Sequence, residues 1–261
     1  MKLFWKLLSA SIRSRMQYKL NFLLSMTANA LLHVLDYVML AAILLRFDNV
    51  KGWEIEEIGF LYGISSIAVS LYRTFAPEIH NFEKYMVHGE FDSLLIRPIS
   101  PFLFLLTRNV NLSHLGGVIQ GLLILTVSAV QLDISLPLFV ALCLYLPVAV
   151  MSSFIIALAL GVVTATIGFW TQKIKDLQAF TLYAPFNAAN FPLTIYPTWL
   201  KFIFFTVLPI AFMNYLPMTY LLNKGGQFYY IFVTPCVSFL FFGLAYHFWS
   251  FGIRFYHSTG S

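Results

Sequence analysis

The stretch that decides the fold is PEIHNFEKYMVHGEFDSLLIRPISP, residues 77–101, the longest polar interruption in an otherwise apolar sequence. On entering it, apolar residues recur at helical steps of four, three and four: Phe75, Ile79, Phe82 and Met86. The polar residues of the same turns fall off that stripe: Glu78, His80, Glu83 and Lys84. This pattern predicts an amphipathic helix that lies parallel to a membrane surface.

The second half of this stretch predicts a sharp return into the membrane. Gly89 can adopt a positive φ and end the first helix, and residues 90–95 begin a second short turn. Two X-Pro pairs then favour extended backbone, and Ser100 and Pro101 are placed as the N-cap and first residue of the next helix. The chain therefore leaves the membrane, forms a shaped surface element and re-enters.

Composition identifies the broad class of protein. Of the 261 residues, 59% are hydrophobic, 18% aromatic and only 10% charged, which is too apolar for a soluble domain of this length. No long polar segment remains for a second domain, so residues 1–261 are predicted to form a single membrane domain. The net charge of +5 comes from basic residues beside apolar runs, which indicates membrane topology rather than nucleic-acid binding.

The apolar runs predict an all-α polytopic membrane protein with six transmembrane helices. The predicted spans are 20–45, 58–76, 102–130, 137–170, 177–195 and 228–253. Before them, residues 1–18 combine basic and apolar residues at helical spacing, which is typical of an interfacial helix. Between the last two spans, prolines cut residues 196–227 into pieces too short to cross, so we expect external re-entrant helices there.

The basic residues also predict the orientation in the membrane. If the N-terminus is cytoplasmic, twelve of the 16 Lys and Arg residues fall on the inside. The four on the outside are Arg46, Lys51, Lys201 and Lys224. We therefore expect a cell-membrane protein with both termini in the cytoplasm. The alternative makes residues 199–222 a full span, which would place the C-terminus outside.

Sequence motifs argue against catalysis by this chain. The sequence has no G-x-x-x-x-G-K-[ST] run, so it lacks the P-loop that cradles nucleotide phosphates. The motifs H-E-x-x-H, G-x-S-x-G and C-x-x-C are also absent from the sequence. We expect no enzyme activity, no cofactor and no metal on this chain, and any ATP hydrolysis would belong to another subunit.

The clearest polar signal within the predicted spans is His33 with Asp36, three residues apart on one face of the first span. Ionisable residues inside a membrane are costly and indicate a functional site. The pair predicts either a proton or substrate site or a packing device, in which His33, His114 or an amide such as Asn29 satisfies the carboxylate. The candidate residues for a translocation path are His33, Asp36, Asn187 and Asn190.

Small residues predict a close helix contact in the third span. Gly117 and Gly121 lie four residues apart, on one helix face, and allow two backbones to approach. The contact could lie within the chain or across the seam of a dimer.

The run GEFDSLLIRPISP, residues 89–101, resembles the G-x-h-D-x-L-L-x-R-P-h-S-P loop between the second and third spans of ABC-2-type permeases, where h is a hydrophobic residue. These are the membrane subunits of ATP-driven exporters. The chain is most similar to bacterial systems that have two permeases and largely unassigned substrates. The resemblance implies that residues 77–101 form a coupling helix docked on a separate ATPase dimer, which binds ATP-Mg. It also implies a second permease subunit, either a related chain or a copy.

Carried over to this sequence, the resemblance implies a set of ATPase-facing residues around a hinge at Gly89. These residues are Glu83, Lys84, His88, Glu90, Phe91, Asp92 and Arg97. The alternative is a merely solvated loop. The implied function is a permease subunit of an ATP-binding-cassette exporter without nucleic-acid partners. Two other functions stay open: a proton-coupled secondary transporter that uses His33 and Asp36, and a structural membrane subunit that transports nothing.

Overall fold

The computed structural model describes residues 6, 9–14, 17–44, 46, 49–132 and 135–257. Within these residues the chain is built of helices, and its only β-type pairing is an isolated bridge between Val50 and Trp53. The predicted interfacial helix, 1–18, falls partly outside the described residues, and of its described part residues 9–14 are helical. The predicted all-α class is confirmed.

Five helices of the described residues are long and apolar enough to cross a membrane. They are α2 (Lys19–Leu44), α3 (Ile55–Phe75), α8 (Leu115–Gln131), α9 (Leu136–Thr171) and α14 (Tyr230–Gly252). A sixth candidate arises only if α12 (Thr198–Thr206) and the helical segment after it count as one span, and these two pieces are bent by 75°. The chain is a multi-pass membrane protein.

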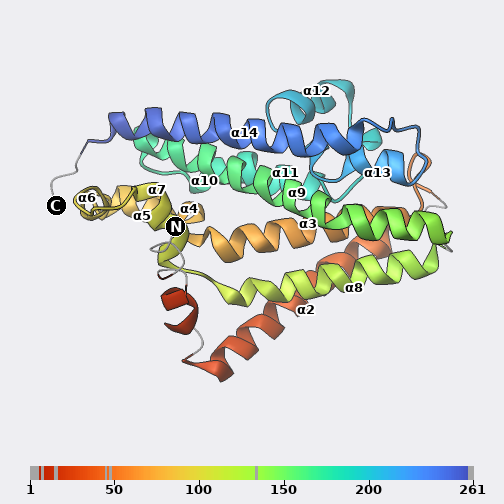
Figure 1. Cartoon of the computed structure of the whole chain (residues 1–261), viewed down its shortest axis with the longest axis horizontal. Helices are drawn as coiled ribbons and strands as arrows, with labels where there is room; N and C mark the ends of the chain where they lie inside the picture. Colours follow the sequence, from red (N-terminus) through yellow and green to blue (C-terminus); the bar gives the residue numbers. More distant parts are fainter. Residues whose placement is uncertain are drawn as a thin grey trace.

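Contacts between α9 and α14 show that these helices run in the same direction. Near the start of both, the Tyr145 hydroxyl donates to the Ile231 carbonyl at 3.0 Å. Near the finish of both, the ring centroids of Phe169 and Trp249 lie 5.1 Å apart. Both helices finish at the end of the bundle that carries residues 77–101 (Figure 1). We call this the 77–101 end.

The first and last described segments also meet this end. Ser11 Oγ accepts a hydrogen bond of 2.8 Å from the Val110 N–H, and the ring of Tyr256 lies 4.8 Å from that of Phe91. Because α9 and α14 both finish here, α14 begins at the opposite end of the bundle. Residues 172–229 must therefore lead from the 77–101 end to the opposite end, which counts as one crossing. This arrangement agrees with six crossings, whereas a separate full span at 199–222 would make α14 finish at the opposite end.

The prediction that residues 177–195 form a single crossing helix is wrong, because the structure breaks this segment into several short elements. Pro192 and Pro197 lack the N–H that a continuing helix needs, and the helix stops before them. The segment instead contains α10 (Lys175–Gln178), a π turn (Ala179–Tyr183), α11 (Ala184–Ala188) and a 3-10 turn (Leu193–Ile195). After it, α12 and α13 (Tyr215–Leu221) lie toward the opposite end of the bundle (Figure 1).

The predicted third span, 102–130, is broken in two. Pro101–Arg108 forms the separate helix α7, which begins at Pro101 as predicted, and the crossing segment starts only at Leu112. At the break, the Asn111 N–H donates to the Thr74 carbonyl at 2.9 Å. Backbone groups at the break therefore find partners on another helix, which the local sequence does not reveal.

The predicted amphipathic helix of the 77–101 element is also interrupted. The element forms α4 (Pro77–His80), α5 (Glu83–Val87) and α6 (Asp92–Leu95). At the first break, the Asn81 side-chain amide donates to the Pro77 carbonyl at 2.9 Å. The apolar stripe was expected to face the membrane surface, but it packs inside the protein, with Phe75 half-buried. Glu78 and His80, expected on the polar face, are buried too. Gly89 has a φ of +66°, as predicted.

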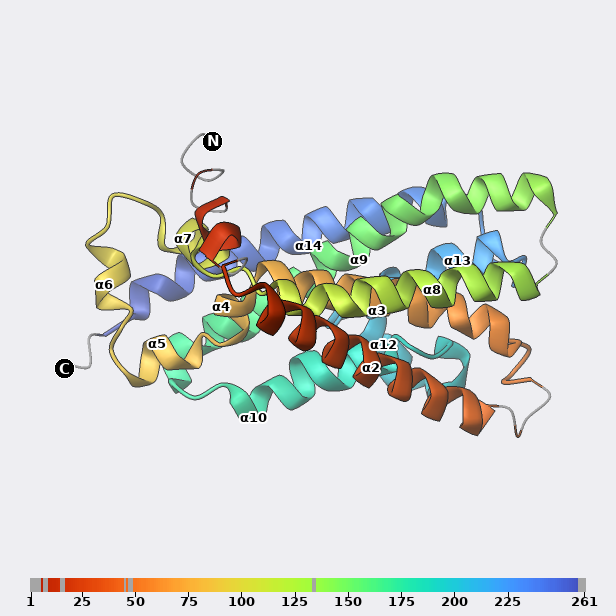
Figure 2. The ribbon, with the colours of Figure 1, turned by 90° about the horizontal axis from the view of Figure 1, so that it is seen from below.

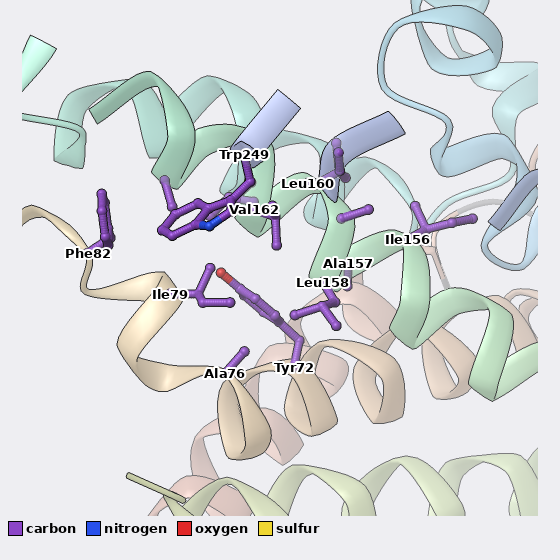
Figure 3. Close-up of a cluster of buried hydrophobic side chains, with 14 of the residues drawn as sticks. Tyr72, Ala76, Ile79, Phe82, Ile156, Ala157, Leu158, Leu160, Val162 and Trp249 are labelled. Carbon is purple, nitrogen blue, oxygen red and sulfur yellow. The ribbon is translucent and has the colours of Figure 1, made fainter. Parts of the chain in front are cut away.

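An apolar core ties the 77–101 element to the spans. Figure 3 shows side chains from α3, the element, α9 and α14 in one cluster, among them Tyr72, Ile79, Phe82, Val162 and Trp249. The rings of Phe82 and Trp249 meet edge to face, with centroids 5.2 Å apart. The element is therefore a packed part of the bundle.

Helix α2 packs much less closely than the other spans. It crosses α3 and α8 obliquely on the outside of the bundle (Figure 2). Only 6% of its most apolar 18-residue stretch is buried within the protein. It approaches α8 closely at Gly116, where an added Cβ would lie 2.9 Å from the Ala30 nitrogen. Most of α2 is left to lipid or to another protein.

The glycines of α8 allow a close contact with another helix of the same chain. A Cβ added at Gly121 would lie 2.6 Å from Ile67 Cγ1 and 3.0 Å from the Gly63 carbonyl oxygen, both on α3. The close contact that the sequence left open therefore joins two helices of one chain.

We predict that Gly121→Ala lowers stability by about 1–3 kcal/mol, because the added methyl group overpacks the α3–α8 contact. The measurement is the thermal melting temperature of the purified protein in detergent. Gly243→Ala on α14 is the matched control, since nothing lies within 4 Å of a Cβ added there. Equal melting temperatures for the two variants would contradict the close contact.

Candidate functional site

The 77–101 element ends in an exposed surface, residues 87–97, which we call the tip. Its exposed apolar side chains are Val87, Leu95 and Ile96, the last 86% exposed. Its exposed charged or titratable side chains are His88, Glu90 and Arg97. Helix α6, which belongs to the tip, lies beyond the packed part of the bundle (Figure 1). Exposed apolar side chains rimmed by polar ones are typical of a docking surface for another protein.

The structure divides the predicted ATPase-facing residues into two groups. His88, Glu90 and Arg97 are exposed, whereas Glu83, Lys84, Phe91 and Asp92 are engaged by the chain itself. Phe91 is fully buried against Phe82 and Tyr256. Asp92 is half-buried, and burial together with Asp92 raises the pKa of the Tyr256 hydroxyl to about 12.

A buried carboxylate, Glu78, anchors the element from inside. Lys84 Nζ lies 2.5 Å from Glu78 Oε2, the Tyr85 hydroxyl donates to the same oxygen at 2.5 Å, and the Asn109 amide donates to Oε1 at 2.8 Å. Arg108 donates to the Tyr85 hydroxyl at 3.1 Å. Burial alone would raise the pKa of Glu78, but these three donors outweigh it and hold the pKa below its ordinary value.

A second set of polar contacts joins the element to the start of α10. Glu83 Oε2 accepts from the backbone N–H groups of Ile174 at 2.7 Å and Lys175 at 2.8 Å. The Gln178 amide donates to the His80 carbonyl at 2.5 Å. We call these five residues the Glu83 clamp. Burial opposes ionisation of Glu83, but the two backbone donors, together with the nearby charges of Lys175 and Lys173, outweigh it and lower the pKa of Glu83.

His80 sits between two tyrosines where the element meets the spans. Its Nδ1 lies 3.4 Å from the Tyr72 hydroxyl and its Nε2 lies 3.2 Å from the Tyr183 hydroxyl. Burial, reinforced by the nearby Arg73 guanidinium, lowers the pKa of His80 to about 3. The imidazole is therefore neutral at physiological pH and joins α3, the element and the π turn.

Sequence reasoning missed these buried polar groups. It placed Glu78 and His80 on a solvent-exposed face and gave no part to Tyr85, Asn109 or Gln178. The available signal was the small number of charges: few ionisable residues in so apolar a chain can stay unpaired. Which groups pair could not be read locally, because Asn109 and Gln178 come from other segments.

The four residues predicted for a translocation path meet at one cavity. The cavity has a volume of about 500 Å³ and lies between α2, α3 and α11. His33 and Asp36 come from α2, and Asn187 and Asn190 come from α11 and the turn after it. The remaining lining residues are Leu40, Tyr62, Ser65, Ser66, Val69, Phe186 and Phe191.

Of the packing partners expected for Asp36, only His33 lies with it at the cavity. The Asn29 amide donates to the Ser25 carbonyl at 2.9 Å, and His114 does not line the cavity. In the described residues no hydrogen bond or ion pair reaches the Asp36 carboxylate, which is exposed in the single chain. His33 is held in place through its carbonyl, which accepts from the Tyr62 hydroxyl at 3.0 Å.

We predict that His80→Gln weakens the loss of stability in mild acid. Because the folded pKa is depressed, the unfolded chain takes up a proton below about pH 6.5 that the folded chain refuses. Between pH 6.5 and 5, this residue should lower the free energy of unfolding of the wild-type protein by up to about 2 kcal/mol. The variant lacks this contribution and should not show that loss. Melting temperatures across this range test it, with His88→Gln on the exposed tip as control. Parallel pH curves for wild type and His80→Gln would refute it.

Comparison with known proteins places the chain in a family. A family model described as ABC-2 family transporter protein matches residues 30–260, which include the tip, the Glu83 clamp and the cavity. No curated protein and no solved structure matches the chain. Members of this family are membrane components of exporters and are not themselves catalytic. With a match over most of its length and several membrane-crossing helices, the chain belongs to the ABC-2 family of transporter proteins, as a multi-pass permease.

Proposed function

We propose that this permease is powered by a separate ATPase dimer, which docks on the tip and drives export. The observation that carries the proposal is the exposed apolar surface around Ile96, held on an element that is packed into the bundle. The sequence has no P-loop motif, which is in keeping with ATP hydrolysis on a separate subunit. The partner would bind ATP-Mg.

The proposal places the 77–101 end in the cytoplasm of a cell-membrane protein. Twelve of the 16 Lys and Arg residues then fall on the cytoplasmic side, in keeping with the positive-inside bias. The first and last described segments both lie at this end, so both termini would be cytoplasmic.

The proposal includes a second permease, related to this chain or a copy of it, across the open side of the cavity. Asp36 and Asn187 are exposed in the single chain although they belong to membrane-embedded segments. A carboxylate and an amide are costly to leave against lipid, so water or another protein must cover them. A partner subunit seated there would complete the wall of a water-accessible path.

The Glu83 clamp offers a route from the tip to that path. It fixes the element to the first turn of α10, and the same helical segment carries Asn187 to the cavity. The π turn between them, Ala179–Tyr183, is a type of irregularity that is frequent at functional sites. Movement of the tip by the ATPase would shift this segment as a lever. Phe91 would hold the tip on the core rather than touch the ATPase.

One other candidate function is favoured by the same cavity. His33 and Asp36 line it together, as a proton-coupled secondary transporter would require. Such a transporter runs without nucleotide, and a purely structural subunit transports nothing. Co-purification of an ATPase whose hydrolysis depends on this chain would separate the proposed function from both.

We predict that Ile96→Glu weakens ATPase association about tenfold or more, because a charge replaces an apolar anchor at the centre of the docking surface. The measurement is recovery of ATPase activity with the tagged permease purified from its host. Ile96→Val, which keeps the surface apolar, is the control and should behave as wild type. Undiminished recovery with Ile96→Glu would contradict docking on the tip.

We predict that Glu83→Ala uncouples the cavity from ATP hydrolysis, whereas Glu83→Gln, which keeps an acceptor oxygen, largely preserves coupling. The readout is the thiol-labelling rate of Asn187→Cys in the assembled complex, with Cys143 and Cys236 replaced by Ser. ATP should change this rate in the wild-type and Gln backgrounds but not in the Ala background. An unchanged ATP response in the Ala background, with the ATPase still bound and active, would refute the lever.

A further inference from the structure

We propose that the cavity of this permease receives an organic cation, an amphiphile whose positive group is met by the Asp36 carboxylate. The inference rests on the proposed function insofar as the cavity is taken as part of the export path. It goes beyond it by assigning the charge and shape of the cargo.

The charge of the lining is the first argument. Asp36 contributes a carboxylate, and the described lining contains no lysine or arginine. In the described residues nothing is bonded to that carboxylate, so its charge is available to a ligand. The charge of Arg73 acts on the lining residue His33, but its guanidinium lies 5.3 Å from the centre of the Tyr183 ring and is not itself part of the lining. An anion would meet a like charge in a region of low dielectric, and a cation would neutralise it.

The apolar part of the lining is the second argument. Tyr62, Phe186 and Phe191 present aromatic rings to the cavity, together with Leu40 and Val69. Aromatic faces attract organic cations and also accept apolar substituents. A volume of about 500 Å³ lies in the range of small-molecule sites. The site therefore suits a bulky cation with apolar groups better than a small hydrated ion.

The neutral polar residues are the third argument. Ser66 donates its hydroxyl hydrogen to Gln120 Oε1 at 2.9 Å, which leaves its oxygen as an acceptor toward the cavity side. Asn187 and Asn190 add side-chain amides from another segment of the chain. Hydroxyl and amide oxygens beside a carboxylate can orient a positively charged or N–H-bearing group.

The experiment compares two probe ions of equal shape and opposite charge, tetraphenylphosphonium and tetraphenylborate. Saturable binding to the purified permease, in complex with its partners, is measured by equilibrium dialysis in detergent. Wild type should bind the phosphonium at least tenfold more tightly than the borate. Asp36→Asn should lose about tenfold in phosphonium affinity, while Asp176→Asn, an exposed carboxylate beside the Glu83 clamp, should match wild type.

A gain-of-binding variant keeps the test independent of folding. Asn187→Asp adds a second carboxylate at an exposed position of the same cavity and should tighten phosphonium binding severalfold. Equal affinity for the two ions, or no effect of either Asp36→Asn or Asn187→Asp, overturns the inference. If the phosphonium does not bind selectively while the ATPase still co-purifies, only the cargo assignment is refuted. If the phosphonium binds selectively but the chain recruits no ATPase, only the proposed function is refuted.

Discussion

The ion pair between the buried carboxylate of Glu78 and the half-buried Lys84 is the interaction on which the rest of the molecule depends. A carboxylate that is 2% exposed is stable as an anion only when donors surround it, and Glu78 has donors from Lys84, Tyr85 and Asn109. These donors come from both sides of the loop that leaves the membrane and returns. Satisfying one charge therefore fixes the shape of the whole 77–101 element and makes the break before α8 part of the fold.

A rigid element of this kind can transmit force in a way that a solvated loop cannot. The tip offers exposed apolar side chains to a partner, while Phe91 and Phe82 pack its inner side on α9 and α14. The Glu83 clamp then links the element to the helical segment 175–188, which contains a π turn and carries Asn187 near its far end. In the proposed function, the tip would receive the ATPase, and the Glu83 clamp with the segment after it would pass movement on to the cavity.

Much of the fold was predictable from the sequence, because a membrane admits few kinds of chain-crossing structure. Apolar runs long enough to cross, the turn at Gly89 and the helix start at Pro101 all follow from local chemistry. The pair His33 and Asp36 was recognisable because ionisable residues are rare in a span. The span at 102–130 was misjudged because hydropathy does not see where a hydrogen bond from another segment interrupts a helix. The span at 177–195 was misjudged because hydropathy counts apolar residues and gives no weight to the prolines before which the helix stops.

By itself, the sequence determined the class of protein, the surface element with its family motif, the absence of a nucleotide-binding motif and the residues worth examining in the spans. Only the tertiary structure decided that Glu78 and His80 face inward, that Glu83 binds the start of α10, and that four separate polar residues meet at one cavity. The physical reason is that periodicity and composition act between neighbours along the chain. Pairing of buried polar groups depends on residues about 30 to 100 positions away, such as Asn109 for Glu78 and Gln178 for His80.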